Sequence, residues 1–140
     1  MRPSSSPSEP ASGALFGALS GGRRADEQLS DAAWLAGLLD AERALALACG
    51  RAGVIPEDAA TAIAVRCDPT LFDAAELGQA ATTAGNPVVP LVRRLTALVP
   101  DFAAPHVHRG ATSQDILDTA ASLVARRALE PIREDLTAAA

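Results

Sequence analysis

The chain has 140 residues, of which 49% are hydrophobic and only 3% aromatic, and its formal net charge is −5 with an isoelectric point near 4.9. The acidic balance argues against nucleic-acid binding, which depends on basic patches. No apolar run reaches the roughly 18 residues that span a membrane. The N-terminal segment lacks the apolar core of a secretory signal, so we expect a cytoplasmic protein. Abundant alanine and scarce aromatic residues predict an all-α fold with closely packed helices.

The chain begins with a stretch rich in serine and proline, residues 1–12, which cannot bury apolar surface and is predicted to be a disordered tail. Helical segments follow within residues 13–111, which we expect to form an N-terminal helical domain. Ser30 can cap the first of them, a long amphipathic helix that runs to about Arg51 and ends near Gly53.

Three shorter helices are predicted next. Pro56 is expected to open a helix that ends near Cys67, because proline is favoured at the first helical position. Another helix is expected over residues 72–82. The third is expected to begin around Pro87 or Pro90, after a glycine that breaks the preceding pattern.

Two features of composition along these helices have ordinary structural interpretations. Cys49 and Cys67 lie in apolar helical surroundings and outside any C-x-x-C pattern, so we expect free, buried thiols. Paired arginines at residues 23–24, 93–94 and 126–127 are expected to form solvated or salt-bridged faces.

The most informative segment is HRGATSQDILDTA, residues 108–120, which places polar side chains around one glycine before an amphipathic helix. Thr112 and Asp115 have the spacing of a capping box, in which a hydroxyl and a carboxylate satisfy free N–H groups at a helix start. Such a start also attracts anions. The segment can therefore begin a helix near Ser113, hold a carboxylate, or do both. Pro131 is expected to kink this last helix.

The pattern H-x-G-x-T-S-x-D in this segment resembles the first signature of the fumarase/aspartase superfamily. With Gln114 at its variable position, it is most similar to the 3-carboxy-cis,cis-muconate cycloisomerases. Upstream, AGNPVVPLV at residues 84–92 resembles a second landmark of the same enzymes. Adenylosuccinate lyases typically have an Arg-His-Asp segment there, so Asn86 favours the cycloisomerases. The resemblance covers nearly all of the chain.

The resemblance implies a set of substrate-binding residues, for which structural roles remain open as alternatives. The set is His108, Thr112, Ser113, Gln114 and Asn86. The hydroxyls can equally cap the helix, Asn86 can cap the preceding helix, and the imidazole can bond a backbone carbonyl.

Asp115 is expected to satisfy N–H groups rather than to transfer protons. His106 and His108 have H-x-H spacing, but two ligands do not make a zinc site, so no metal is expected.

The resemblance further implies an intramolecular lyase that converts 3-carboxy-cis,cis-muconate to a carboxymuconolactone in protocatechuate (β-ketoadipate) catabolism. Its substrate is a small tricarboxylate, no cofactor is involved, and the enzyme is expected to be a homotetramer. The family's catalytic Thr-His segment and Gly-Ser-Ser loop do not occur in the sequence, so no catalytic residue is assigned here.

Residues 112–140 are accordingly expected to be the first helix of a truncated central helical bundle, and the 140-residue chain alone is expected to be inactive. Two alternatives remain: an adenylosuccinate-lyase-type β-eliminating lyase, and a non-catalytic helical interaction protein derived from this fold.

Overall fold

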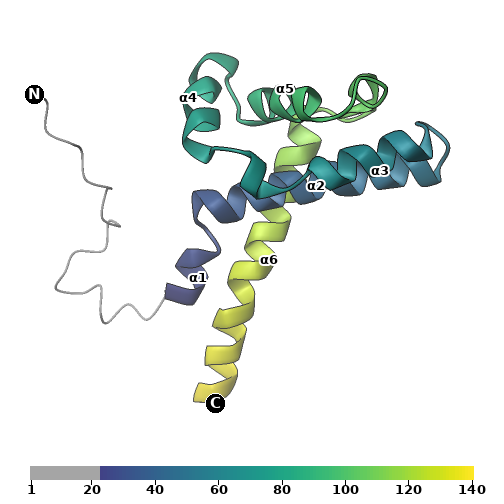
Figure 1. Ribbon diagram of the computed structural model, residues 1–140. Helices are drawn as coiled ribbons and strands as arrows, with labels where there is room; N and C mark the ends of the chain where they lie inside the picture. Colours follow the sequence, from purple (N-terminus) through teal and green to yellow (C-terminus); the bar gives the residue numbers. More distant parts are fainter. Residues whose placement is uncertain (1–22) are drawn as a thin grey trace, which may run out of the picture.

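The computed structural model describes residues 23–140, which fold into α-helices joined by short loops, with no strand among these residues (Figure 1). The all-α prediction is confirmed. The predicted tail, residues 1–12, lies outside the described part of the chain. The elements in order are α1 (Arg23–Glu27), α2 (Asp31–Arg51), α3 (Glu57–Arg66), the 3₁₀ turn η1 (Pro69–Leu71), α4 (Ala74–Ala84), α5 (Val88–Leu98), the 3₁₀ turn η2 (Ala104–His106) and α6 (Ser113–Ala139).

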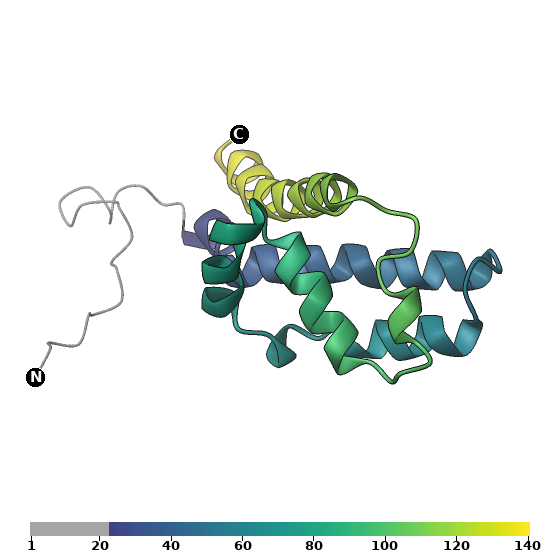
Figure 2. The same cartoon turned by 90° about the horizontal axis from the view of Figure 1, so that it is seen from above.

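Helices α2 and α3 form an antiparallel pair that lies side by side (Figure 2). The side chain of Ser30 caps α2 as predicted, accepting a hydrogen bond of 3.2 Å from the amide of Ala33. Near the other end of α2 the two helices approach closely: a Cβ added to Gly50 would lie 2.6 Å from the Cβ of Ala60. Small residues on both helices therefore permit this packing distance.

Helix α6 crosses α2 and continues well past it (Figure 1). Gly37 of α2 lies at the crossing, where an added Cβ would be 3.4 Å from the carbonyl oxygen of Ala120 and 3.4 Å from a methyl group of Val124. Helix α6 runs through Pro131 without interruption, so this proline does not end the helix. The largest fully buried apolar side chains of the core come from α2, α3, α5 and α6: Leu39, Ile63, Val88, Leu91, Leu95 and Val124.

Helix α4 begins at Ala74, two residues after the start predicted for the helix over residues 72–82. The carboxylate of Asp73 accepts hydrogen bonds of 2.8 and 3.2 Å from the amides of Ala75 and Glu76. Asp73 is therefore the N-cap, and the chain before it stays extended because a capping residue takes non-helical backbone angles.

Ion pairs join α1 and α2 to α6. Arg24 of α1, a helix that the sequence analysis did not predict, lies 2.6 Å from Glu134. Arg127 lies 2.6 Å from Asp40 of α2. Two of the three arginine pairs thus contain a salt-bridged member, as predicted. Within residues 23–140, no helix combines the length and the apolar character needed to cross a membrane.

Candidate functional site

The start of α6 is held by a reciprocal cap. The amide of Thr112 donates a 2.7 Å hydrogen bond to the carboxylate of Asp115, and its hydroxyl donates to the same oxygen at 2.9 Å. In return, the amide of Asp115 donates to the Thr112 hydroxyl at 3.3 Å. The hydrogen bond from the Thr112 backbone, with that from its side chain, holds the pKa of the Asp115 carboxyl below its usual range. The predicted capping box is confirmed, and Asp115 fills the structural role expected for it.

Free donors remain at this helix start. Ser113 is half-buried, and no hydrogen bond of its hydroxyl is described within residues 23–140. The backbone N–H groups of Ser113 and Gln114 belong to the first turn, where an α-helix offers them no internal partner. The side-chain amide of Gln114 donates to Asp118 at 2.7 Å, one turn along the helix. An external anion would therefore meet the Ser113 hydroxyl and two backbone donors.

The imidazole of His108 faces a buried carboxylate on α2. Its Nδ1 lies 2.6 Å from Oε1 of Glu42, and the Glu42 side chain is only 1% exposed. The imidazole is largely covered as well, with 17% of its side chain exposed. This contact joins the loop before α6 to the middle of the core helix, across 66 positions of sequence.

Glu42 is the buried charged residue of the described core, and sequence analysis missed it. Its second oxygen, Oε2, has no hydrogen-bond partner within the described structure. Burial raises the pKa of the Glu42 carboxyl, and the hydrogen bond from His108 acts in the opposite direction. In the sequence, a glutamate next to an arginine in an amphipathic helix is typical of a solvated face. Only the long-range contact with His108 therefore reveals that Glu42 belongs to the site.

The loop that carries His108 has an unusual backbone. His108 has φ of 57°, in the left-handed region that residues other than glycine seldom occupy, and Gly110 follows with φ of 81°. Strain of this kind costs about 1–3 kcal/mol and persists only where surrounding contacts impose it. Here the contacts are the Glu42 hydrogen bond and a 3.7 Å contact between the Cys49 thiol and the carbonyl of Arg109.

Asn86 lies at the start of another helix. Its side-chain oxygen accepts hydrogen bonds of 3.0 and 3.2 Å from the amides of Val88 and Val89. The capping alternative considered for Asn86 is therefore observed, and α5 begins at Val88, next to one of the two predicted starts. No hydrogen bond between Asn86 and residues 108–115 is described.

The surroundings of Glu42 include one of the two free cysteines. Cys67, just past the end of α3, is fully buried, and burial together with the nearby Glu42 charge raises the pKa of its thiol to about 12. The guanidinium of Arg43 donates a hydrogen bond to the Cys67 carbonyl. Cys67 is thus a buried, free thiol, as predicted, whereas Cys49 is free but half-buried.

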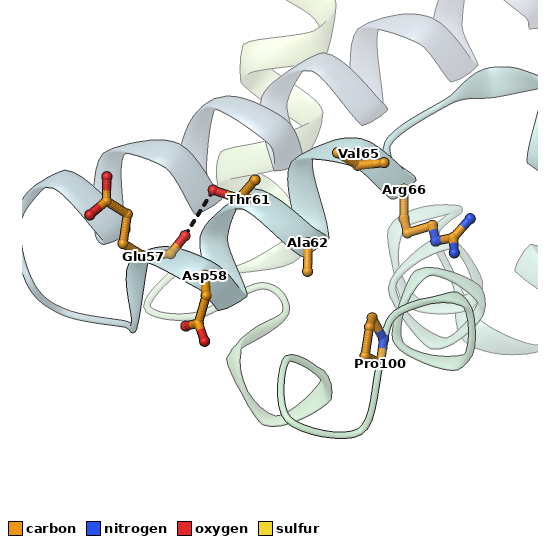
Figure 3. Close-up of a pocket in the computed structure, with 7 residues that line it drawn as sticks. All are labelled: Glu57, Asp58, Thr61, Ala62, Val65, Arg66 and Pro100. Atoms are coloured by element: carbon orange, nitrogen blue, oxygen red, sulfur yellow. Dashed lines mark hydrogen bonds between the residues drawn. The ribbon is translucent and has the colours of Figure 1, made fainter.

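The remaining candidate features of residues 23–140 do not add a site. No three His, Cys, Asp or Glu side chains of this part of the chain gather as metal ligands would. A surface hollow of about 800 Å³ lies between α3 and the loop at Pro100 (Figure 3). Glu57 and Asp58 line it toward the start of α3 and Arg66 toward its end. The hollow is open to solvent and contains none of the predicted site residues.

Comparison with known proteins reveals related lyases and cycloisomerases, although no protein-family model matches the chain. The chain is 47% identical over 125 residues to the nitrosuccinate lyase of Streptomyces davaonensis. The aligned region covers 87% of this chain and 26% of that protein. It is 46% identical over 112 residues to the 3-carboxy-cis,cis-muconate cycloisomerase of Bradyrhizobium diazoefficiens, covering 78% of this chain and 25% of that protein.

A solved structure also resembles this chain over part of its length. The crystal structure of the 3-carboxy-cis,cis-muconate lactonizing enzyme from Pseudomonas putida superposes with a TM-score of 0.81 at 41% identity, over 87% of this chain and 28% of that one. The chain thus spans about a quarter of the length of the relatives that it matches.

Proposed function

Because the chain belongs to the fumarase/aspartase superfamily, we propose that it supplies part of the active site of an enzyme that converts 3-carboxy-cis,cis-muconate to a carboxymuconolactone. The observation that supports this most is the start of α6. There, the capping box uses the amide of Asp115 and leaves the Ser113 hydroxyl and the backbone N–H groups of Ser113 and Gln114 for a carboxylate.

In this reaction one substrate carboxylate adds across a conjugated double bond, and negative charge develops on another carboxylate in an enolate-like species. Fixed donors stabilise such charge best when they are already oriented, since no reorganisation is then needed. We assign this task to the Ser113 hydroxyl, the backbone of Ser113 and Gln114, and the imidazole of His108. Thr112 and Asn86 contribute by capping the starts of α6 and α5.

The proton that completes the reaction is supplied at the adjacent carbon. No general acid or base is assigned to this chain, and no metal or cofactor takes part in the proposal. The substrate is a small tricarboxylate, and the setting is cytoplasmic catabolism of protocatechuate.

We also propose a domain boundary and an assembly. Residues 13–111 form the N-terminal domain, and residues 112–140 begin a central helical bundle that assembles as a homotetramer. Support comes from the distal part of α6, where Leu129, Ile132 and Leu136 are 59%, 42% and 67% exposed. Their spacing of three and four positions places them on one apolar face, which a neighbouring helix would cover.

A second candidate function is a lyase that eliminates a group β to a carboxylate. The nitrosuccinate lyase relative favours it, because its identity to this chain is as high as that of the cycloisomerase relative. Such an elimination also places enolate-like charge on a carboxylate, so the donors at the start of α6 serve both reactions. The geometry of the helix start fits both reactions and does not distinguish them. The two reactions differ in the substrate bond that is formed or broken.

Substrate assays separate the candidates. The whole protein should consume 3-carboxy-cis,cis-muconate with loss of its conjugated absorbance and formation of a lactone that carries all of the substrate's atoms. Turnover of nitrosuccinate without lactone formation would replace the cycloisomerase with the lyase. Turnover of neither compound, in a folded protein, would favour a non-catalytic helical interaction protein.

A further inference from the structure

We propose that Glu42 is a positioning residue for His108: the two side chains share one proton, and this arrangement presents Nε2–H of the imidazole as a donor to a substrate carboxylate. The inference rests on the proposed function for its ligand and deepens the role of the same site. It assigns His108 to binding rather than to proton abstraction.

The geometry supports a shared proton. The 2.6 Å separation of Nδ1 and Oε1 is short for a nitrogen–oxygen hydrogen bond and typical of one that involves a charged group. A hydrogen on this line belongs either to the imidazole, facing a carboxylate, or to the carboxyl group, facing a neutral ring. When the pair holds one proton beyond its fully deprotonated form, Nε2 carries a hydrogen in both arrangements.

Burial explains why the pair keeps that proton. If the pair lost it, Glu42 would hold a full charge at a position 1% exposed, with Oε2 already lacking a partner. An uncompensated charge in such surroundings is strongly disfavoured. The two nitrogens of an imidazole direct their hydrogen bonds to different sides of the ring, so Nε2 points away from α2. The left-handed backbone of His108 is the conformation that brings the ring to Glu42.

Other ionisable groups act on the pair. Asp115 faces His108 from the start of α6, and the charge of the imidazole contributes to lowering the pKa of its carboxyl. Cys67 faces Glu42 from the end of α3 and stays protonated because burial raises its pKa. Arg43 binds the Cys67 carbonyl beside them. The negative charge of Asp115 favours retention of the shared proton, whereas the protonated thiol of Cys67 is neutral and adds no charge beside the pair.

The chain contains two histidines, so a ¹H–¹⁵N spectrum of the imidazole groups of the 140-residue protein contains its own reference. His106 has no comparable carboxylate partner described within residues 23–140 and serves as that reference. We expect a strongly deshielded proton resonance for the hydrogen between Nδ1 of His108 and Oε1 of Glu42, and no such resonance for His106. Glu42→Gln keeps a hydrogen-bonding group of the same size but cannot share a proton, so it should abolish this resonance. The exposed Glu76→Gln serves as the matched control and should leave the resonance unchanged.

A contact that only joins α2 to the loop, without a shared proton, gives a different result. The deshielded resonance would then be absent from the unmodified protein, or Glu42→Gln would leave it unchanged, and either result overturns the proposal. Should Glu42→Gln fail to fold, the comparison of the two histidines in the unmodified protein still decides the question. The sample contains no substrate, so the outcome is independent of which reaction the whole protein catalyses.

Discussion

Replacing the two adjacent hydroxyls at the start of α6 should separate the binding role from the capping role. Thr112 uses its hydroxyl twice, as donor and as acceptor, within the capping box with Asp115. Ser113 uses its hydroxyl in no hydrogen bond described within residues 23–140. Thr112→Ala should therefore lower stability, and Ser113→Ala should lower activity.

The magnitudes follow from these contacts. Loss of an N-cap side chain costs about 0.5–2 kcal/mol of stability, so Thr112→Ala should lower the melting temperature measurably. The Thr112 cap also depends on the ionised form of Asp115. Because the pKa of that carboxyl is lowered in the folded state, the stabilisation is present above the carboxyl's unfolded pKa and is lost as the pH falls through the folded value. The effect of Thr112→Ala should thus shrink in acid.

Ser113→Ala removes a hydrogen bond to a charged substrate group, worth about 1.5–3 kcal/mol. Transition-state arithmetic converts this into roughly a tenfold to hundredfold loss of kcat/KM, with little change in melting temperature. Ser122→Ala is the matched control: this exposed serine of α6 only donates to the Asp118 carbonyl, so its loss should affect neither property strongly.

The measurements are kcat/KM on the whole protein and thermal unfolding of each variant. Normal kinetics combined with a lowered melting temperature in Ser113→Ala would refute the binding role, because the serine would then be part of the helix cap. A loss of activity in Ser122→Ala as large as that in Ser113→Ala would show that the assay reports a general disturbance of α6.

Two further predictions concern packing and thiol chemistry. Gly50→Ala should lower stability by about 1–3 kcal/mol, since its new methyl group would lie 2.6 Å from the Cβ of Ala60. In Gly37→Ala the new methyl group meets only ordinary contacts at 3.4 Å. The stability of this variant should stay unchanged or rise by up to about 1 kcal/mol, because alanine has the higher helix propensity. Equal melting temperatures for the two variants would contradict this packing. Iodoacetamide at mildly alkaline pH should alkylate the half-buried Cys49 well before the buried Cys67, whose raised pKa leaves little reactive thiolate. Mass spectrometry that finds both thiols modified at one rate would rule out the buried environment of Cys67.

Sequence alone predicted the features whose causes are local. The cap at Ser30, the box formed by Thr112 and Asp115, and the helix opened by Pro56 all depend on residues within one turn of each other. The late start of α4 was missed although its cause is also local, because the capping role of Asp73 was not considered.

The contact between Glu42 and His108 could not be predicted in this way. It joins residues 66 positions apart, and its energetics depend on burial that arises only when α2, α3 and the loop before α6 pack together. The sequence identified His108 as a site candidate through its motif, but nothing near Glu42 distinguishes it from the exposed glutamates of the chain. Helix α1 was missed for a related reason, because its ion pair to α6 spans 110 positions.

The continuity of α6 has a consequence for how the sequence can change. Its 27 residues form a rod of about 40 Å that starts at the candidate site and carries its exposed apolar face at the far end. One residue inserted between Val124 and Leu129 would advance that face by about 1.5 Å and turn it by about 100°. Whatever packs against the distal face would then meet it at the wrong angle, even though every residue at the site is unchanged. Insertions in this stretch should therefore be far less tolerated than insertions of equal length in the loop at Pro100.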